Sequence, residues 1–179
     1  MTKNEIINQF PLITFMDFEE NNSEEHYNTY AITPFDKWFT YEEMEIVFDP
    51  IEKEMHNGVY GKEPASFICF YNQLYENHLI YAVLMVDYIN KDVDNRFELI
   101  KITNQDEFKN LYLDSLKGIA LMRLIIPELD LLLESMFDLT DLLHFRNNTS
   151  LKNIKKVQNY FENCGLNSLE WGQNKNVLK

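Results

Sequence analysis

The sequence predicts an α+β fold, in which an antiparallel β-meander over about residues 65–103 packs with helices on its N- and C-terminal sides. Three runs rich in β-branched and aromatic residues follow one another across short polar connections. Apolar residues at helical spacing dominate much of the chain after residue 104. Strands and helices do not alternate as in a parallel sheet. With 179 residues, of which 45% are hydrophobic, we expect one domain over residues 1–166 and a loosely ordered tail over 167–179.

The first segment is predicted to be a short helix followed by a strand and a loop. Thr2-x-x-Glu5 is a capping-box pattern, which marks a helix start. Residues 12–18 are apolar enough for a strand. Residues 19–25 contain four acids and form the most polar stretch of the chain, which is typical of a solvated loop.

A second capping box, Thr40-x-x-Glu43, predicts a helix that begins near residue 41. Pro50 disfavours helical geometry at the residue before it and is expected to break or kink this helix. A strand over residues 44–48 followed by a short helix over 50–56 is the open alternative.

The predicted meander consists of residues 65–72, 79–89 and 96–103, which are separated by polar breaks. The third run alternates between apolar and polar residues, as a half-buried strand does. The middle run is almost wholly apolar, so we expect it to lie centrally and to be covered on both faces.

Helices are expected to follow the meander. Residues 105–117 and 150–163 carry apolar residues at helical spacing. Residues 119–126 are ambiguous between strand and helix. A proline at the first turn predicts a helix over about residues 127–133, with an extension to His144 as an alternative.

The meander, from Phe67-Ile-Cys-Phe-Tyr-Asn to Phe97-Glu-Leu-Ile-Lys-Ile, precedes the segment Gly118-Ile-Ala-Leu-Met-Arg123. In this order the chain resembles a family of small bacterial and phage α+β proteins of unknown function, over about residues 40–135. The resemblance implies the fold and brings no activity. In size and acidity the chain also resembles the general class of small acidic proteins of phages and mobile elements.

The two cysteines, Cys69 and Cys164, form no paired motif and are predicted to be buried free thiols. The first residues are polar and no apolar stretch of a signal peptide follows. Apolar runs are too short for a membrane span. The expected location is therefore the cytoplasm, without membrane contact.

Charge is unevenly distributed, because residues 1–64 hold 14 acids and four lysines, whereas residues 146–179 carry a net positive charge. A total of −13 repels nucleic acid and favours a protein partner with a basic surface. Acids next to aromatic residues offer both charge and hot-spot contacts, although solubility alone is the simpler interpretation. The candidate partner-binding residues are Trp38, Tyr41, Glu42, Glu43, Glu45, Asp49 and Glu52.

These observations favour a non-enzymatic protein–protein interaction module. In its sharper form it is an acidic inhibitor of anti-defence or immunity type, whose carboxylates mimic DNA in the cationic site of a nucleic-acid-handling partner. No nucleophile motif, phosphate loop or cofactor motif is recognisable, so no cofactor is expected. One alternative is an enzyme or metal sensor around Asp138, Asp141 and His144, which would share one side of a helix. Another is a structural subunit of a homo-oligomer such as a homodimer.

Overall fold

The computed structural model describes residues 1–13, 23–85, 97–136 and 138–169. The strands of this part form one seven-stranded sheet in the order β3-β2-β4-β5-β6-β1-β7, and every pairing is antiparallel. The strands are β1 (Tyr27–Thr33), β2 (Tyr81–Met85), β3 (Phe97–Lys101), β4 (Arg123–Ile126), β5 (Leu131–Ser135), β6 (Asp141–Arg146) and β7 (Asn167–Leu169).

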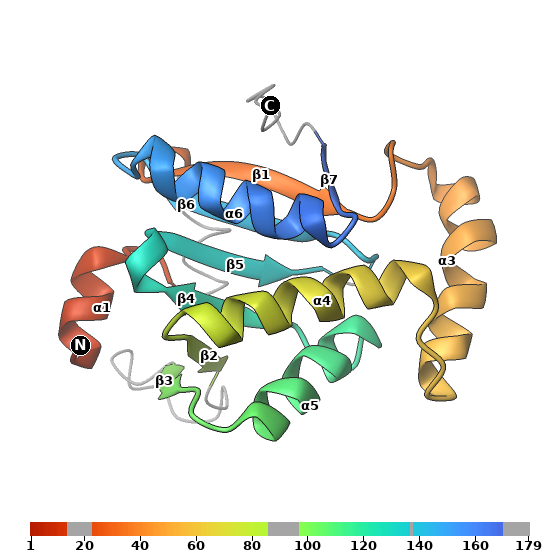
Figure 1. Cartoon of the computed structure of the whole chain (residues 1–179), viewed down its shortest axis with the longest axis horizontal. Helices are drawn as coiled ribbons and strands as arrows, with labels where there is room; N and C mark the ends of the chain where they lie inside the picture. Colours follow the sequence, from red (N-terminus) through yellow and green to blue (C-terminus); the bar gives the residue numbers. More distant parts are fainter. Residues whose placement is uncertain (14–22, 86–96, 137, 170–179) are drawn as a thin grey trace.

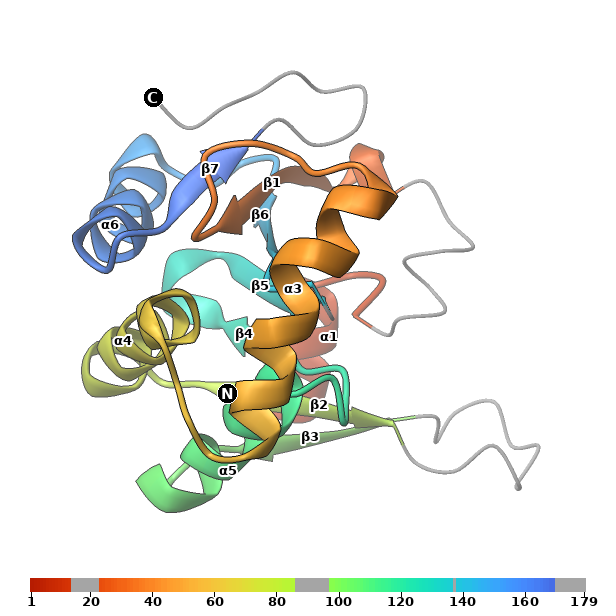
Figure 2. The ribbon, with the colours of Figure 1, turned by 90° about the vertical axis from the view of Figure 1, so that its right-hand side faces the viewer.

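Helices cover the two faces of the sheet unequally (Figures 1 and 2). Three long helices, α4, α5 and α6, pack on one face and enclose the main core. The short helix α1 lies on the second face over a smaller core, and α3 lies across the end of the sheet. The helices are α1 (Lys3–Gln9), α3 (Tyr41–His56), α4 (Lys62–Asn77), α5 (Gln105–Leu116) and α6 (Leu151–Asn163), with short 3-10 turns η1 (Ser23–Glu25) and η3 (Pro127–Leu129).

The α+β class is confirmed, but the predicted three-stranded meander is only half right. Strands β2 and β3 form the expected hairpin pair. Residues 65–72 belong to helix α4 instead of a strand. The apolar residues of this segment follow a helical period and not the alternation of a strand. Buried positions i, i+3, i+4 and i+7 are occupied by Phe67, Phe70, Tyr71 and Leu74.

The helix predicted from Pro127 onward is also wrong. After one 3-10 turn, Asp130 adopts the left-handed conformation with φ 53°, and the chain enters the β5–β6 hairpin. Three consecutive leucines, Leu131 to Leu133, are fully buried, which fits a strand covered on both faces. The ambiguous residues 119–126 contain strand β4.

Local helix signals are confirmed elsewhere. Both capping boxes form, and α5 and α6 lie where the helical spacing predicts them. Residues 167–169, expected to begin a loose tail, form β7 at the edge of the sheet. The predicted strand over 12–18 and most of the tail lie outside the described residues, and no described helix is long and apolar enough to cross a membrane.

The expectation of free thiols is wrong, because Cys69 and Cys164 form a disulfide with a Cα–Cα distance of 5.7 Å. The bond joins helix α4 to the C-terminal end of α6, two elements that pack side by side on the sheet. Nε2 of Gln73 lies 3.2 Å from the sulfur of Cys164. The disulfide closes a sequence separation of 95 residues, which no local pattern reveals.

Candidate partner-binding surface

Helix α3 holds six of the seven candidate partner-binding residues, and Trp38 lies in the segment that leads into it. The Thr40 side chain accepts from the Glu43 N–H, and Glu43 accepts from the Thr40 N–H, so the first turn is firmly capped. The helix continues through Pro50 without interruption. Because Ile46 and Pro50 are both exposed, the Ile46 carbonyl that loses its helical bond is left to water.

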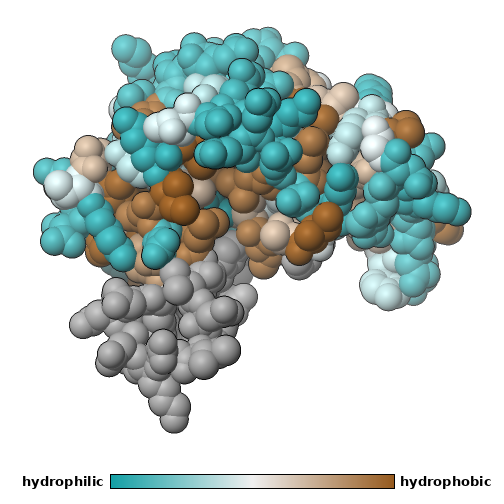
Figure 3. Space-filling view, turned by 90° about the horizontal axis from the view of Figure 1, so that it is seen from below, coloured by the Kyte–Doolittle hydropathy of each residue, from teal (hydrophilic) through white to brown (hydrophobic). Residues whose placement is uncertain are grey.

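Helix α3 is attached to the body by very little buried surface. Of its 16 residues only Met55 is fully buried, while Phe48 and Ile51 pack partly against the main core. Seen from below, α3 forms the mostly hydrophilic lobe on the right of the molecule (Figure 3). A helix held so lightly presents most of its circumference to a partner.

Four carboxylates form one stripe along α3. Glu42, Glu45, Asp49 and Glu52 follow one another at spacings of three, four and three residues, which places them on one helical face about 15 Å long. Among the described residues, no Lys or Arg forms an ion pair with them. The imidazole of His56 lies beside the last of them, with its Nε2 3.7 Å from Oε1 of Glu52. We call these four residues the acidic stripe.

Glu43 does not belong to the acidic stripe. Besides capping the helix, its Oε1 lies 2.8 Å from the ammonium group of Lys37. The hydrogen bonds from Lys37 and Thr40 hold the pKa of the Glu43 carboxyl below its usual value. Glu43 is therefore a structural residue of the helix start.

Apolar side chains flank the acidic stripe. Tyr41 is 77% exposed, Ile46 is 76% exposed and Trp38 is 42% exposed. Large exposed apolar groups beside charges are typical of the centre of protein interfaces. The combination gives this end of the molecule both long-range attraction for cations and contact area.

The three residues of the alternative metal or enzyme site do not converge. Asp138 precedes β6, and Asp141 and His144 lie within that strand three residues apart, so their side chains point to opposite faces of the sheet. The helix that would have aligned them is absent. Among the described residues, no group of three or more His, Cys, Asp or Glu is placed to hold a metal ion.

Asp141 points into the main core, where it accepts a 2.7 Å hydrogen bond from the Tyr71 hydroxyl. Burial, helped by nearby Asp138, raises the pKa of Asp141 to about 8 against the opposing effect of the hydrogen bond from Tyr71. The carboxyl is therefore mostly protonated in the folded state at neutral pH.

Replacing Asp141 with Asn is expected to flatten the pH dependence of stability. The pKa of the folded state, about 8, exceeds the ordinary value of 3.8, so the stability that this group contributes is fully present below pH 4 and declines as the pH rises toward 8. Relative to the wild type, Asp141→Asn should gain about 1 kcal/mol per pH unit between pH 5 and 8. Urea denaturation at three pH values measures this, with the exposed Asp49→Asn as control. Parallel curves for wild type and Asp141→Asn would show that Asp141 is already ionised in the fold.

A buried polar network on the second face of the sheet was not predicted. Nη2 of Arg123 lies 2.7 Å from Oε2 of Glu134, which is 3.4 Å from Nε2 of His144. The other imidazole nitrogen, Nδ1, is hydrogen-bonded to the Thr29 hydroxyl at 2.8 Å. These residues come from β4, β5, β6 and β1, which are adjacent in the sheet.

The electrostatics of this network favour a charged pair beside a neutral imidazole. Burial opposes ionisation of Glu134, but His144 and Arg123 outweigh it and hold the pKa of the carboxyl below its usual value. Burial lowers the pKa of His144 despite the opposing effect of Glu134. The Thr29 hydroxyl, the His144 imidazole and the Glu134 carboxylate follow one another in the order of a proton relay. Arg123 and His144 are almost fully buried, so the network is best explained as a structural ion pair.

The lysines of helix α6 do not cover the acidic stripe. Lys152, Lys155 and Lys156 are exposed on α6, which lies away from α3 (Figure 1). No ion pair between described residues joins α6 to α3.

No family model, curated protein or solved structure matches the chain.

Proposed function

We propose that the protein is a protein–protein interaction module that binds a basic partner through α3. The observation that carries the proposal is the acidic stripe, four carboxylates on one face of a lightly attached helix with no Lys or Arg ion-paired to them in the described part of the chain. Such a row of charges accelerates and orients association with a cationic surface. Exposed Tyr41 and Ile46 supply the apolar contacts.

In the sharper form of this proposal, the partner handles nucleic acid and the protein inhibits it as an anti-defence or immunity factor. Regularly spaced carboxylates on a rigid helix offer a cationic groove the kind of charge that a nucleic-acid backbone offers. The small size and acidity that the chain shares with the general class of small acidic phage and mobile-element proteins favour this form. The proposed place of action is the cytoplasm. The disulfide argues against this location, because disulfides persist mainly in oxidising compartments.

Reversing the charge of the acidic stripe is expected to abolish partner binding. Tagged wild-type protein should retain a partner from bacterial lysate at about 0.1 M salt and release it at about 0.5 M, where the Debye length falls from roughly 10 Å to about 4 Å. The variant Glu45→Lys/Asp49→Lys/Glu52→Lys should retain less than a tenth as much. Glu43 is left intact, because its loss would weaken the helix cap.

The matched control is Glu76→Lys/Glu98→Lys/Glu162→Lys, which changes the net charge equally at exposed positions outside α3. It should retain the partner as the wild type does. Equal loss in both variants, or binding that is insensitive to salt, would overturn the proposal. Light scattering of the protein alone at both salt concentrations shows whether the partner is a second copy, in which Lys152, Lys155 and Lys156 meet the acidic stripe.

A further inference from the structure

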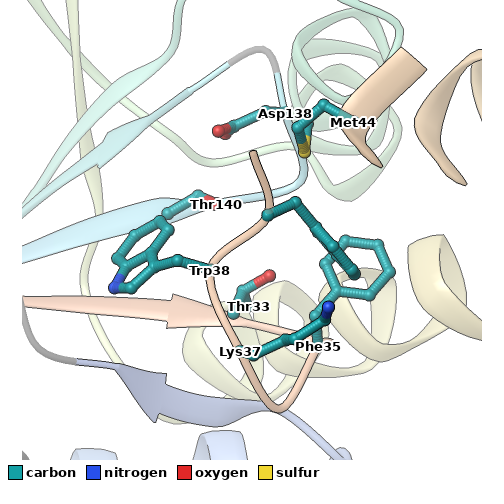
Figure 4. Close-up of a pocket in the computed structure, with 8 residues that line it drawn as sticks. Thr33, Phe35, Lys37, Trp38, Met44, Asp138 and Thr140 are labelled. Carbon is teal, nitrogen blue, oxygen red and sulfur yellow. The ribbon is translucent and has the colours of Figure 1, made fainter. Parts of the chain in front are cut away.

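A small cavity lies between the segment that leads into α3 and residues 138–140, which precede β6 (Figure 4). Its volume is about 50 Å³, which exceeds the space for one water molecule and suits a planar group of a few atoms. Thr33 at the end of β1 and Thr140 just before β6 line the cavity together with Trp38, Met44 and Asp138.

Asp138 gives the cavity a carboxylate that no described cation neutralises. Thr140 donates to its carboxylate, but the second oxygen, Oδ1, is buried and has no hydrogen-bond partner among the residues that the structure describes. No ion pair between described residues includes Asp138. A buried carboxylate oxygen without a donor is costly, and burial accordingly raises the pKa of Asp138. A cationic hydrogen-bond donor in the cavity would relieve this cost.

Aromatic rings supply the second element of a cation site. Figure 4 shows the indole of Trp38 on the same side of the cavity as the carboxylate of Asp138, with Thr140 between them. Lys37 and Phe39 also line the cavity, and the ammonium group of Lys37 lies 5.1 Å from the centre of the Phe39 ring. Its ion pair with Glu43 neutralises this ammonium group. The cavity wall thus already binds one cation through an aromatic face.

We propose that this cavity binds a guanidinium group, namely an arginine side chain of the basic partner; the partner part of this inference rests on the function proposed above. A guanidinium is planar, stacks on an indole and offers several N–H donors to a carboxylate. An ammonium group is more strongly hydrated and loses more on leaving water.

The cavity lies close enough to the acidic stripe for both to contact the same partner. Met44 lines the cavity and Glu45 belongs to the acidic stripe, so the two sites adjoin at the first turns of α3. The stripe attracts a basic segment over a long range, whereas a single arginine in the cavity fixes its register.

Trp38 makes the site directly measurable. The chain contains two tryptophans, so the variant Trp171→Phe leaves Trp38 as the single indole. Titration with n-butylguanidinium at constant ionic strength should change its fluorescence in a saturable manner, whereas the neutral isostere n-butylurea should not. Adding Asp138→Asn should weaken the binding of n-butylguanidinium at least fivefold, and adding Glu76→Gln, a matched control at an exposed position of α4, should leave it within twofold.

A response that is linear and equal for both compounds would overturn the guanidinium site. If Asp138→Asn does not fold, calorimetric titration of Trp38→Leu decides instead, with loss of binding heat expected and retained heat contradicting the proposal. Failure of the two proposals is distinguishable. Partner binding that needs the acidic stripe but survives both Asp138→Asn and Trp38→Leu overturns the cavity proposal alone. A saturable, Asp138-dependent titration without stripe-dependent partner binding upholds the guanidinium site and overturns the proposed function.

Discussion

Replacing Glu134 with Gln is expected to lower the free energy of unfolding by about 3 kcal/mol. The substitution removes the carboxylate that lies 2.7 Å from the guanidinium of Arg123, whose side chain is fully buried. A buried cation that loses its charge partner keeps the full cost of leaving water, and the hydrogen bond from Arg123 to the Ile13 carbonyl offsets only part of it. Urea denaturation at pH 7 measures the change.

The double variant Arg123→Met/Glu134→Leu provides the control. Removing both charges removes the desolvation cost as well, so its stability should return to within about 1 kcal/mol of the wild type. A loss below about 1 kcal/mol in Glu134→Gln alone would show that the charge of Arg123 is balanced elsewhere. Retained partner binding in the double variant is expected, because the network lies on the second face of the sheet and not on α3.

Helix boundaries were the part of the fold that could be predicted from sequence, because their signals are local. The hydroxyl of Thr40 and the carboxylate of Glu43 act within one turn, and the apolar spacing of α5 and α6 is contained in each helix. These interactions need no information about distant residues. They form wherever the rest of the chain permits a helix.

The errors concern apolar segments whose structure is decided by what packs against them. Residues 65–72 contain three aromatic residues and one β-branched residue, which suggested a strand. The burial of Phe67, Phe70 and Tyr71 follows the helical period instead, so that one face of α4 packs on the sheet. Residues 131–133 read equally well as buried helix or buried strand. Pairing with β4 and β6 on both sides selects the strand.

The candidate sites show the same contrast between local signals, which the sequence reveals, and contacts between distant residues, which it does not. The four residues of the acidic stripe were all among the candidates, because acids next to aromatic residues are visible in the sequence. Their alignment on one face was left open and depends on the helix that runs through Pro50. Asp138, Asp141 and His144 were grouped on a helix that does not form, and in a strand a spacing of three reverses the side-chain direction. The network of Arg123 and Glu134 depends on the register of two strands. Reading residues 123–135 as a hairpin would have placed these two residues opposite each other.

Reduction of the Cys69–Cys164 disulfide is expected to lower the free energy of unfolding by about 4.5 kcal/mol. The bond closes a loop of 95 residues in the unfolded chain, and its loss restores the conformational entropy that this closure removes. Urea denaturation with and without dithiothreitol measures the effect. The variant Cys69→Ser/Cys164→Ser is the control and should be unaffected by the reductant.

The same measurement decides the proposed location. Cytoplasmic thiols are kept reduced, so a cytoplasmic protein must remain folded without this bond. Identical unfolding curves with and without dithiothreitol would contradict the predicted stabilisation. A reduced form that is stable at growth temperature and still binds through α3 is compatible with the cytoplasm, because α3 contributes only Met55 as a fully buried residue and makes no contact through the disulfide. A reduced form that unfolds at growth temperature requires an oxidising compartment, and the basic partner of the acidic stripe must then be sought there.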